Sequence, residues 1–341
     1  MTPRERVLRA LRREPLDRVP VLEMAIDWKV MRGLGFRRYL DMIEGLNLDA
    51  VSVNQMLYVL GWRRFVLPFV SHYTDEWGVR SRLAGEILPV PVGHPLADLS
   101  LLDSFRPPDP AKSPLLDAVR YVRRRMPHRA LVMVSRNDFA ASWFLCGMDL
   151  LLMSFIDSPP LVDRLMEMVS GYYTRLFALA IEAGVDVIFL TDDYAYKSGT
   201  LMGRERFSRF ILPWLQRGVA AVHEAGGLCV KHTDGNITEI IDLLIGTGID
   251  GLGPLEPAAG NDLVAIQREW GDRVALVGNI DVDLLSRGST AQVSETTRTL
   301  VRALSSTGGH ILSSGNTITS SVDPDNFRAM IAAGRGAALP L

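Results

Sequence analysis

The segment Val187-Ile-Phe-Leu-Thr-Asp-Asp193 decides the fold class, because an apolar run ends abruptly in polar residues. Its first four residues are apolar on both faces, as in a strand buried on both sides within a parallel sheet. Four later runs follow the same pattern, each leading into a polar residue or glycine: Leu228–Val230 into Lys231, Ile249–Leu255 into Glu256, Val274–Val277 into Gly278, and Ile311–Leu312 into Ser313. We expect each run to be a buried strand with polar groups at its carboxyl end.

Helical stretches separate these runs. Residues 207–222 carry apolar side chains at helical spacing, and residues 161–172 do the same ahead of Val187. Candidate strands in the first half continue the alternation at residues 19–23, 50–53 and 131–134. Repeated strand–helix alternation predicts an α/β fold with a parallel sheet. The chain shows no linker, and its 341 residues suit a single barrel domain over residues 1–341.

Two segments add to this alternation. Residues 1–15 place arginines between apolar residues, which predicts an amphipathic helix as an N-terminal extension rather than the apolar core of a signal peptide. Residues 73–82 lie between the second and third candidate strands and are predicted to form a small hairpin excursion.

Composition excludes several classes of protein. A formal net charge of −2 argues against a nucleic-acid surface, which usually carries a basic excess. The two cysteines, Cys146 and Cys229, form no CxxC motif, which excludes a disulfide scaffold or a cysteine-rich zinc site. The apolar runs are far shorter than the roughly 18 residues of a membrane span. We therefore expect a cytoplasmic protein.

In a parallel barrel the functional groups sit at the carboxyl ends of the strands. This rule selects a short set of candidates from the sequence: Glu23, Asn54, Asn137, Asp138, Asp192, Asp193, His232, Asp234, Glu256, Asn279, Asp281 and Asn316.

The pair His232-Thr-Asp234 is the most informative of these. Residues i and i+2 of an extended chain point to the same face, so the imidazole and the carboxylate face the same way. Such a pair can bind a divalent metal or act as an acid–base pair. The alternative is a hydrogen-bonded pair that closes the mouth of the barrel.

The adjacent carboxylates Asp192 and Asp193 point to opposite faces if the strand continues through them. One can enter the barrel while the other caps the next turn or helix, and Lys197 can pair with either. Two carboxylates held close together raise one pKa, which suits a proton donor or a metal ligand. A purely structural network is the competing interpretation.

Three further strand ends offer polar groups. Asn279 is the better inward candidate in Gly278-Asn-Ile-Asp281, since Asp281 fits the N-cap of the next helix. Glu256 precedes a proline at a strand exit and can reach the pocket. Asn316 offers an amide to an anion, although asparagine is also common in tight turns.

Several motifs together resemble uroporphyrinogen decarboxylase-like proteins. They appear in the same order along nearly the whole chain: Met1-Thr-Pro-Arg-Glu-Arg-Val-Leu-Arg-Ala-Leu11, Asp17-Arg-Val-Pro-Val21, Thr74-Asp-Glu-Trp-Gly78, His223-Glu-Ala-Gly226, His232-Thr-Asp-Gly-Asn236, Gly278-Asn-Ile-Asp281 and Ser314-Gly-Asn-Thr-Ile318. The resemblance implies a (β/α)₈ barrel. It also implies one of two chemistries, namely cofactor-free decarboxylation of a tetrapyrrole or zinc-dependent methyl transfer involving a corrinoid protein.

The chain departs from the decarboxylase pattern at charged positions. The family's arginine-rich segment corresponds here to residues 26–32, followed by Arg37 and Arg38, and matches poorly. Asn54 stands near the position of the aspartate that holds the pyrrole nitrogens, and Asn316 near that of a histidine. An amide cannot supply the negative charge that the pyrrole N–H groups favour. These departures speak against tetrapyrrole decarboxylation.

The methyltransferase pattern is also altered. Thiol-methylating members bind zinc through His-x-Cys and a second Cys, whereas this chain has His232-Thr-Asp234 and Asn316. Histidine and carboxylates form a harder site than thiolates, which suits an oxygen or nitrogen substrate. Glu256, or one of the two adjacent aspartates Asp192 and Asp193, can supply the missing ligand.

The first hypothesis is therefore a metal-dependent methyltransferase that moves a methyl group from a small O- or N-methyl donor to a corrinoid protein. The corrinoid belongs to a separate partner, because the chain contains no Asp-x-His-x-x-Gly motif. The predicted ligands of Zn²⁺ are His232, Asp234 and Glu256. The resemblance also suggests a homodimer.

Two alternatives remain open. One is a metal-free decarboxylase or lyase in which Asp193, Lys197 and His232 transfer protons and Arg32, Arg37 and Arg38 bind carboxylates. The other is a non-catalytic barrel that binds a small molecule, which pairing of the strand-end carboxylates with Lys197 and Lys231 would favour. Across the first two hypotheses the residues divide into two predicted groups: catalytic Asp193, Lys197, His232 and Asp234; and substrate-binding Glu23, Asn54, Asp192, Asn279 and Asn316.

Overall fold

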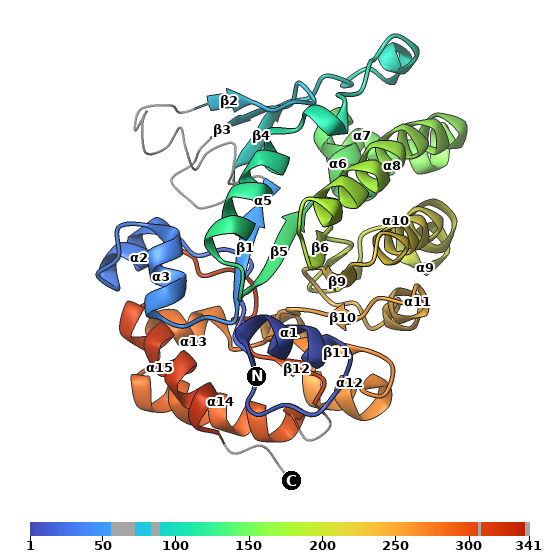
Figure 1. The fold of residues 1–341 in the computed structure, drawn as a ribbon. Helices are drawn as coiled ribbons and strands as arrows, with labels where there is room; N and C mark the ends of the chain where they lie inside the picture. Colours follow the sequence, from blue (N-terminus) through green and yellow to red (C-terminus); the bar gives the residue numbers. More distant parts are fainter. Residues whose placement is uncertain (56–71, 83–88, 306–307, 338–341) are drawn as a thin grey trace.

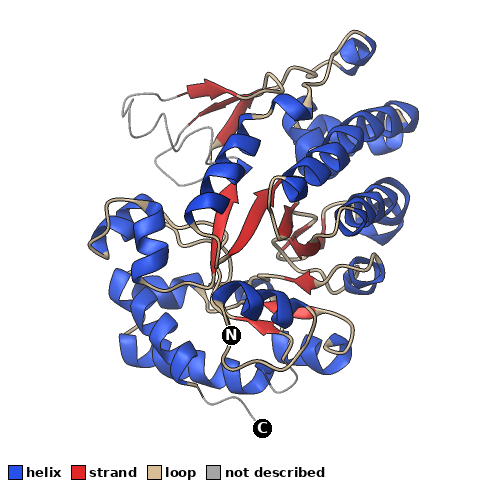
Figure 2. Cartoon of the chain, in the orientation of Figure 1, coloured by secondary structure: helices blue, strands red, loops and turns tan. Residues whose placement is uncertain are grey.

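A curled parallel sheet organises the chain (Figures 1 and 2). The computed structural model describes residues 1–55, 72–82, 89–305 and 308–337. The sheet contains seven strands in the order β1-β5-β6-β9-β10-β11-β12. Their bounds are β1 Ala50–Asn54, β5 Ala130–Ser135, β6 Val187–Thr191, β9 Leu228–His232, β10 Gly251–Leu252, β11 Ala275–Val277 and β12 His310–Ile311.

The segment formed by residues 19–26 closes the sheet into a barrel. Val21 forms a parallel bridge to Leu312, next to β12. On its other side, the carbonyl of Val21 accepts a hydrogen bond from the Asp49 amide at 3.0 Å, just before β1. The segment therefore occupies the place of the eighth strand between β12 and β1, which confirms the predicted (β/α)₈ fold. The strand expected at residues 19–23 is reduced to an isolated bridge at Val21.

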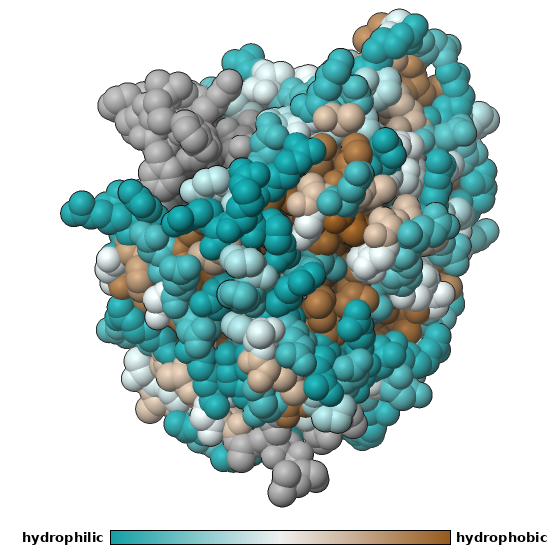
Figure 3. Space-filling model, in the orientation of Figure 1, coloured by the Kyte–Doolittle hydropathy of each residue, from teal (hydrophilic) through white to brown (hydrophobic). Residues whose placement is uncertain are grey.

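Helices cover the outside of the barrel (Figure 2). The α-helices are α1 Pro3–Leu11, α2 Trp28–Gly33, α3 Tyr39–Gly45, α5 Pro114–Arg125, α6 Asp138–Cys146, α7 Met148–Asp157, α8 Pro159–Glu182, α9 Gly203–Arg206, α10 Leu212–Glu224, α11 Ile241–Gly246, α12 Leu263–Trp270, α13 Val282–Arg287, α14 Thr290–Leu304 and α15 Pro324–Gly336. Figure 3 shows hydrophilic residues over much of one face, with apolar residues gathered between them near its centre.

The described core divides into two clusters. One fills the space between the strands and the outer helices, and the other fills the inside of the barrel. Val7, Ala10 and Leu11 of α1 belong to the inner cluster together with Ala50 and Ala130, which begin β1 and β5. The predicted N-terminal helix therefore covers the amino-terminal end of the barrel. Its start is fixed by Thr2, whose hydroxyl accepts from the Glu5 amide.

The predicted excursion at residues 73–82 is an antiparallel hairpin of β2 His72–Thr74 and β3 Arg80–Arg82. A third strand, β4 Val90–Gly93, pairs with β3 and was not predicted. In Figure 1 this small sheet lies beyond the carboxyl ends of β1 and β5. Within the described ranges, no single helix is long and apolar enough to cross a membrane, and only the pair α6 and α7, bent by 103°, passes that test together.

Candidate metal centre

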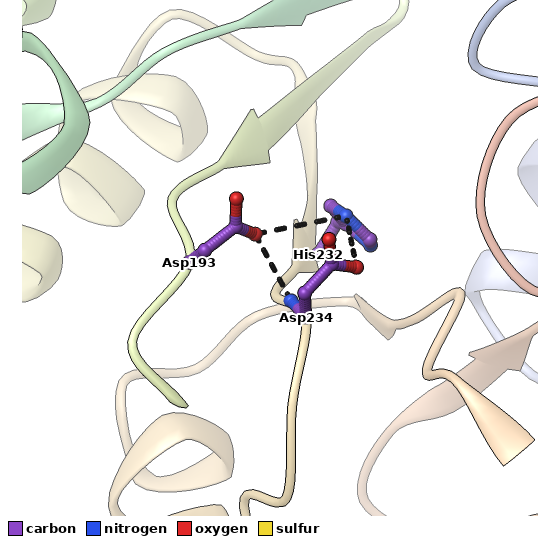
Figure 4. A group of neighbouring side chains, drawn as sticks. All are labelled: Asp193, His232 and Asp234. Carbon is purple, nitrogen blue, oxygen red and sulfur yellow. Dashed lines mark hydrogen bonds and ion pairs between the residues drawn. The ribbon is translucent and has the colours of Figure 1, made fainter. Parts of the chain in front are cut away.

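A histidine and two aspartates meet at the carboxyl ends of β6 and β9 (Figure 4). Along β9, Val230 packs into the inner cluster whereas Cys229 packs into the outer one. His232 follows Val230 by two residues and so faces the barrel axis, as the alternation of a strand requires. Asp193 follows the end of β6, and Asp234 follows the end of β9.

The orientation of the His232 ring leaves one nitrogen available to a ligand. Nδ1 lies 2.7 Å from the carbonyl oxygen of Pro254, which can only accept, so Nδ1 carries the proton in the neutral ring. Nε2 then presents a lone pair, 3.4 Å from Oδ1 of Asp234 and 3.9 Å from Oδ1 of Asp193. A backbone carbonyl that fixes the other ring nitrogen is the usual support for a metal-binding histidine.

Hydrogen bonds also fix the two carboxylates. Oδ1 of Asp193 accepts from the Asp234 amide at 3.0 Å, and Oδ1 of Asp234 accepts from Nδ2 of Asn316 at 2.9 Å. Oε2 of Glu256 accepts from the Gly235 amide at 3.3 Å, which places a third carboxylate beside the pair. One ligand atom from each of Asp193, His232 and Asp234 lies within 4.8 Å of the others, a spacing that a single metal ion can bridge.

The electrostatics of the cluster favour a cation. The pKa of Asp234 is raised to about 6, chiefly by burial and also by the neighbouring charges of Asp193 and Glu256, whereas His232 and the Asn316 amide act in the opposite direction. A divalent cation would relieve this repulsion between carboxylates. The donor set of one imidazole nitrogen and carboxylate oxygens fits zinc and the neighbouring divalent metals.

The two adjacent aspartates have separate roles. The carboxylate of Asp192 is buried and accepts from the amides of Asn137 at 2.9 Å and Ala140 at 3.1 Å, so it caps the start of α6. It also accepts from the hydroxyl of Tyr194 at 3.1 Å. Asp193 instead faces His232, with 54% of its side chain exposed. Both oxygens of Asp192 are thus occupied by groups of the protein, and Asp193 belongs to the cluster.

The other predicted residues lie in varied surroundings. Glu23 is buried and accepts from the Ser314 amide at 2.8 Å and from its hydroxyl at 2.7 Å, and burial raises its pKa to about 8. Asn279 donates to the carbonyl of Leu255 at 2.9 Å. Asn54 is buried at the end of β1.

The predicted basic residues lie at the surface. Lys197 is exposed in the turn between β7 Ala195–Tyr196 and β8 Gly199–Thr200. Arg32, Arg37 and Arg38 are exposed as well. Asp281 caps α13, as predicted, by accepting from the Asp283 amide at 2.6 Å.

Sequence reasoning missed the role of Lys231, which it treated only as a basic neighbour. The side chain is completely buried, and burial lowers its pKa to about 8. Its ammonium group donates to backbone carbonyls rather than pairing with a carboxylate. The sequence signal for a buried lysine was its position between the apolar run Leu228–Val230 and the candidate ligand His232. Lysine is almost never fully buried unless it is paired, so such a position points to specific partners.

The fold and the position of this cluster define a (β/α)₈ barrel whose polar site lies where such enzymes carry their active sites. Residues 52–336 match the family model described as uroporphyrinogen decarboxylase (URO-D). The chain belongs to the URO-D family, as its motifs suggested.

Two relatives that match nearly the whole chain are named for different reactions. Uroporphyrinogen decarboxylase of Alkalilimnicola ehrlichii is 28% identical, covering 96% of this chain and 92% of its own length. Methylcobamide:CoM methyltransferase MtbA of Methanosarcina acetivorans is 22% identical, covering 97% of this chain and 96% of its own. A solved methyltransferase from Methanosarcina mazei shares the fold, with a TM-score of 0.81 over 98% of both chains at 21% identity. The family is one of enzymes and includes both decarboxylases and methyltransferases.

Proposed function

We propose that this protein is a metal-dependent methyltransferase that moves a methyl group from a small O- or N-methyl donor to a corrinoid protein. The observation that carries the proposal is the position of His232 Nε2, which lies 3.4 Å from Oδ1 of Asp234 and 3.9 Å from Oδ1 of Asp193 while Nδ1 is held by the Pro254 carbonyl. Two carboxylates beside an imidazole, with ligand atoms within 4.8 Å of one another, form a site that a divalent cation would stabilise.

The proposed ligands are His232, Asp193 and Asp234, with Glu256 beside them. When bound there, Zn²⁺ would act as a Lewis acid on the donor heteroatom, which makes that atom a better leaving group. His232 is held in the required tautomer by the Pro254 carbonyl, and Asn316 holds Asp234 in position. The methyl group would pass to a reduced corrinoid carried by a separate protein, while the donor heteroatom keeps the bonding electron pair and takes up a proton.

The donor set also favours a class of substrate. Carboxylates and imidazole prefer harder partners than thiolates do, so the site suits an oxygen or nitrogen ligand from the substrate. The relative from Methanosarcina acetivorans is named for transfer to the thiol coenzyme M, whereas the present chain has Asp234 and Asn316 where the thiol-methylating pattern has cysteines. We therefore place the substrate among methoxylated compounds and methylamines.

A decarboxylase on a tetrapyrrole is the second candidate, favoured by the 28% identity to a relative of that name. Asn54, at the end of β1, speaks against it because an amide lacks the charge that pyrrole N–H groups favour. The non-catalytic alternative would be favoured by pairing of the strand-end carboxylates with Lys197 and Lys231. Lys197 is exposed, and Lys231 donates to carbonyls, so neither observation supports that pairing.

The test is an assay of methyl transfer to free, chemically reduced cobalamin. Zinc-loaded protein would be mixed with a panel of methoxylated aromatic compounds and methylamines, and methylcobalamin would be followed by absorbance. We expect formation with at least one donor and none with the Asp193→Asn variant. Turnover of uroporphyrinogen by the metal-free protein, with no methyl transfer, would contradict the proposal.

A further inference from the structure

The hydrogen-bonded pairing of β6 with β9 includes His232 but ends two residues before Asp193 and Asp234. The final paired residues are Thr191 and His232. Asp193 and Asp234 therefore lie beyond the sheet, where regular backbone pairing no longer fixes their separation. Two contacts continue across the gap: the Asp234 amide donates to Asp193, and the Tyr194 amide donates to the hydroxyl of Thr233 at 2.9 Å.

Lys231 lies directly behind this gap, on the outer side of β9. Its ammonium nitrogen is 2.9 Å from the Asp192 carbonyl and 3.5 Å from that of Leu190, and it also donates to the carbonyl of His232. The Asp192 carbonyl belongs to the peptide bond that leads into Asp193. One ammonium group thus joins the backbone of both ligand-bearing strand ends.

The surroundings of Lys231 indicate that this arrangement is specific. The side chain is 0% exposed, and in the described part of the chain it forms no ion pair with a carboxylate. The ammonium instead lies 4.3 Å from the ring centroid of Tyr194, at cation–π distance. Burying an unpaired lysine is costly, so a residue in this position needs the compensation that the three carbonyls and the ring provide.

We infer that Lys231 is a positioning residue for the metal centre, which sets the separation of Asp193 from His232 and Asp234 by tying together the ends of β6 and β9. The inference rests on the proposed metal site and adds to it a group that contacts neither metal nor substrate. Groups that orient metal ligands in this way typically change metal affinity by roughly 10- to 100-fold when they are removed.

The direction in which metal affinity changes when Lys231 is replaced distinguishes a positioning role from a purely electrostatic one. If Lys231 acted only through its positive charge, its removal would tighten the binding of a divalent cation. If Lys231 instead holds the ends of β6 and β9 together, its removal would weaken the binding of the cation. Lys231→Met tests this, because methionine is similar in length and apolar. Lys231→Gln, which keeps an N–H donor, serves if the methionine variant does not fold. The matched control is Cys229→Ala, a buried position on the same face of the same strand.

Two readouts decide the question. Cobalt(II) titration of the apoprotein, followed by its visible spectrum, should show roughly 10- to 100-fold weaker binding and a changed spectrum in Lys231→Met only. Hydrogen exchange of the metal-free protein should show loss of protection at the amides of Tyr194 and Asp234 in the same variant. Cobalt binding as tight as in the parent or tighter, or unchanged protection of both amides, would overturn the inference. If the parent itself binds no cobalt, the proposed function fails, and hydrogen exchange alone decides the role of Lys231.

Discussion

The two ends of β6 carry aspartates in opposite electrostatic settings. Asp186, just before the strand, pairs with Arg4 at 2.7 Å and with Arg123 at 2.5 Å. Asp193, just after it, pairs with no arginine or lysine in the described part of the chain, and the same holds for Asp234 and Glu256. The amino-terminal end of the barrel is thus neutralised within the protein, whereas the carboxyl-terminal end holds excess negative charge around one imidazole.

The aspartate before β6 thus contributes to ion pairs that stabilise the fold, whereas the aspartate after β6 belongs to the candidate metal centre. At the amino-terminal end, Asp49 repeats the pattern of Asp186, with Arg6 at 2.6 Å and Arg18 at 2.8 Å. Asp17-Arg18, part of the motif that resembles the family, thus contributes to ion pairing beneath the barrel. Paired charges at the amino-terminal end stabilise the barrel, whereas carboxylates without an arginine or lysine partner among the described residues lie at the carboxyl-terminal end, where such barrels carry their active sites.

The largest effect is expected from the amino-terminal end. Asp49→Asn removes a fully buried carboxylate and leaves the buried Arg6 with a weakened set of partners, which should lower the free energy of unfolding by about 3 to 5 kcal/mol. Urea denaturation measures this change. Metal affinity of the folded variant should stay as in the parent, and a parallel loss of metal would contradict the separation of the two ends.

The carboxyl-terminal end should respond to metal instead. Free zinc at about 100 times its dissociation constant should stabilise the parent by about 2.7 kcal/mol, since it binds only the folded state. His232→Ala should lose this gain. His310→Ala is the control, because His310 is also buried but contacts Ser305 and the Gly278 carbonyl. Thermal unfolding with and without zinc gives the comparison, and an equal gain in both variants would argue against His232 as a ligand.

A smaller effect is expected where a ligand is only oriented. Asn316→Ala removes the amide that donates to Asp234, which should weaken metal binding roughly tenfold. Competition with a coloured chelator measures the affinity. Asp281→Ala, which removes the cap of α13, should change stability without changing affinity. Equal affinities in the parent and the Asn316 variant would show that Asp234 needs no such support.

The last effect depends on pH and concerns Glu23, because burial raises the pKa of its carboxyl group while the two donors of Ser314 act in the opposite direction. The folded pKa of about 8 exceeds the ordinary value of 4.5 for a glutamate, so the protonated form contributes stability that is full below pH 4.5 and is lost as the pH rises through 8. The glutamine of the Glu23→Gln variant does not titrate. The free energy of unfolding of this variant, relative to that of the parent, should therefore increase between pH 4.5 and pH 8. Urea denaturation from pH 4 to pH 9 measures the difference, and a constant difference would refute a raised pKa.

The sequence predicted the strands well because each is an apolar run that ends in a polar residue. Val187–Leu190 and Ile311–Leu312 lie at or beside strands of the barrel. The period of two along a strand also predicted that His232 and Asp234 face the same way. In the structure, Nε2 of His232 lies 3.4 Å from Oδ1 of Asp234.

Other features depend on contacts that the sequence does not encode locally. The choice between Asp192 and Asp193 could not be made, because the strand pairing ends at Thr191 and the chain then turns. The start of α6, which Asp192 caps, lies more than 50 residues away along the chain. Lys231 was overlooked because its partners are backbone carbonyls, which any residue can provide.

The metal content of the protein, purified without chelator, tests the central claim most directly. Elemental analysis would compare the parent with the His232→Ala and Asp234→Ala variants. We expect close to one zinc, or one similar divalent metal, per chain in the parent and its loss in both variants. Metal-free parent protein that also fails to take up added zinc would contradict a cation site at the mouth of the barrel.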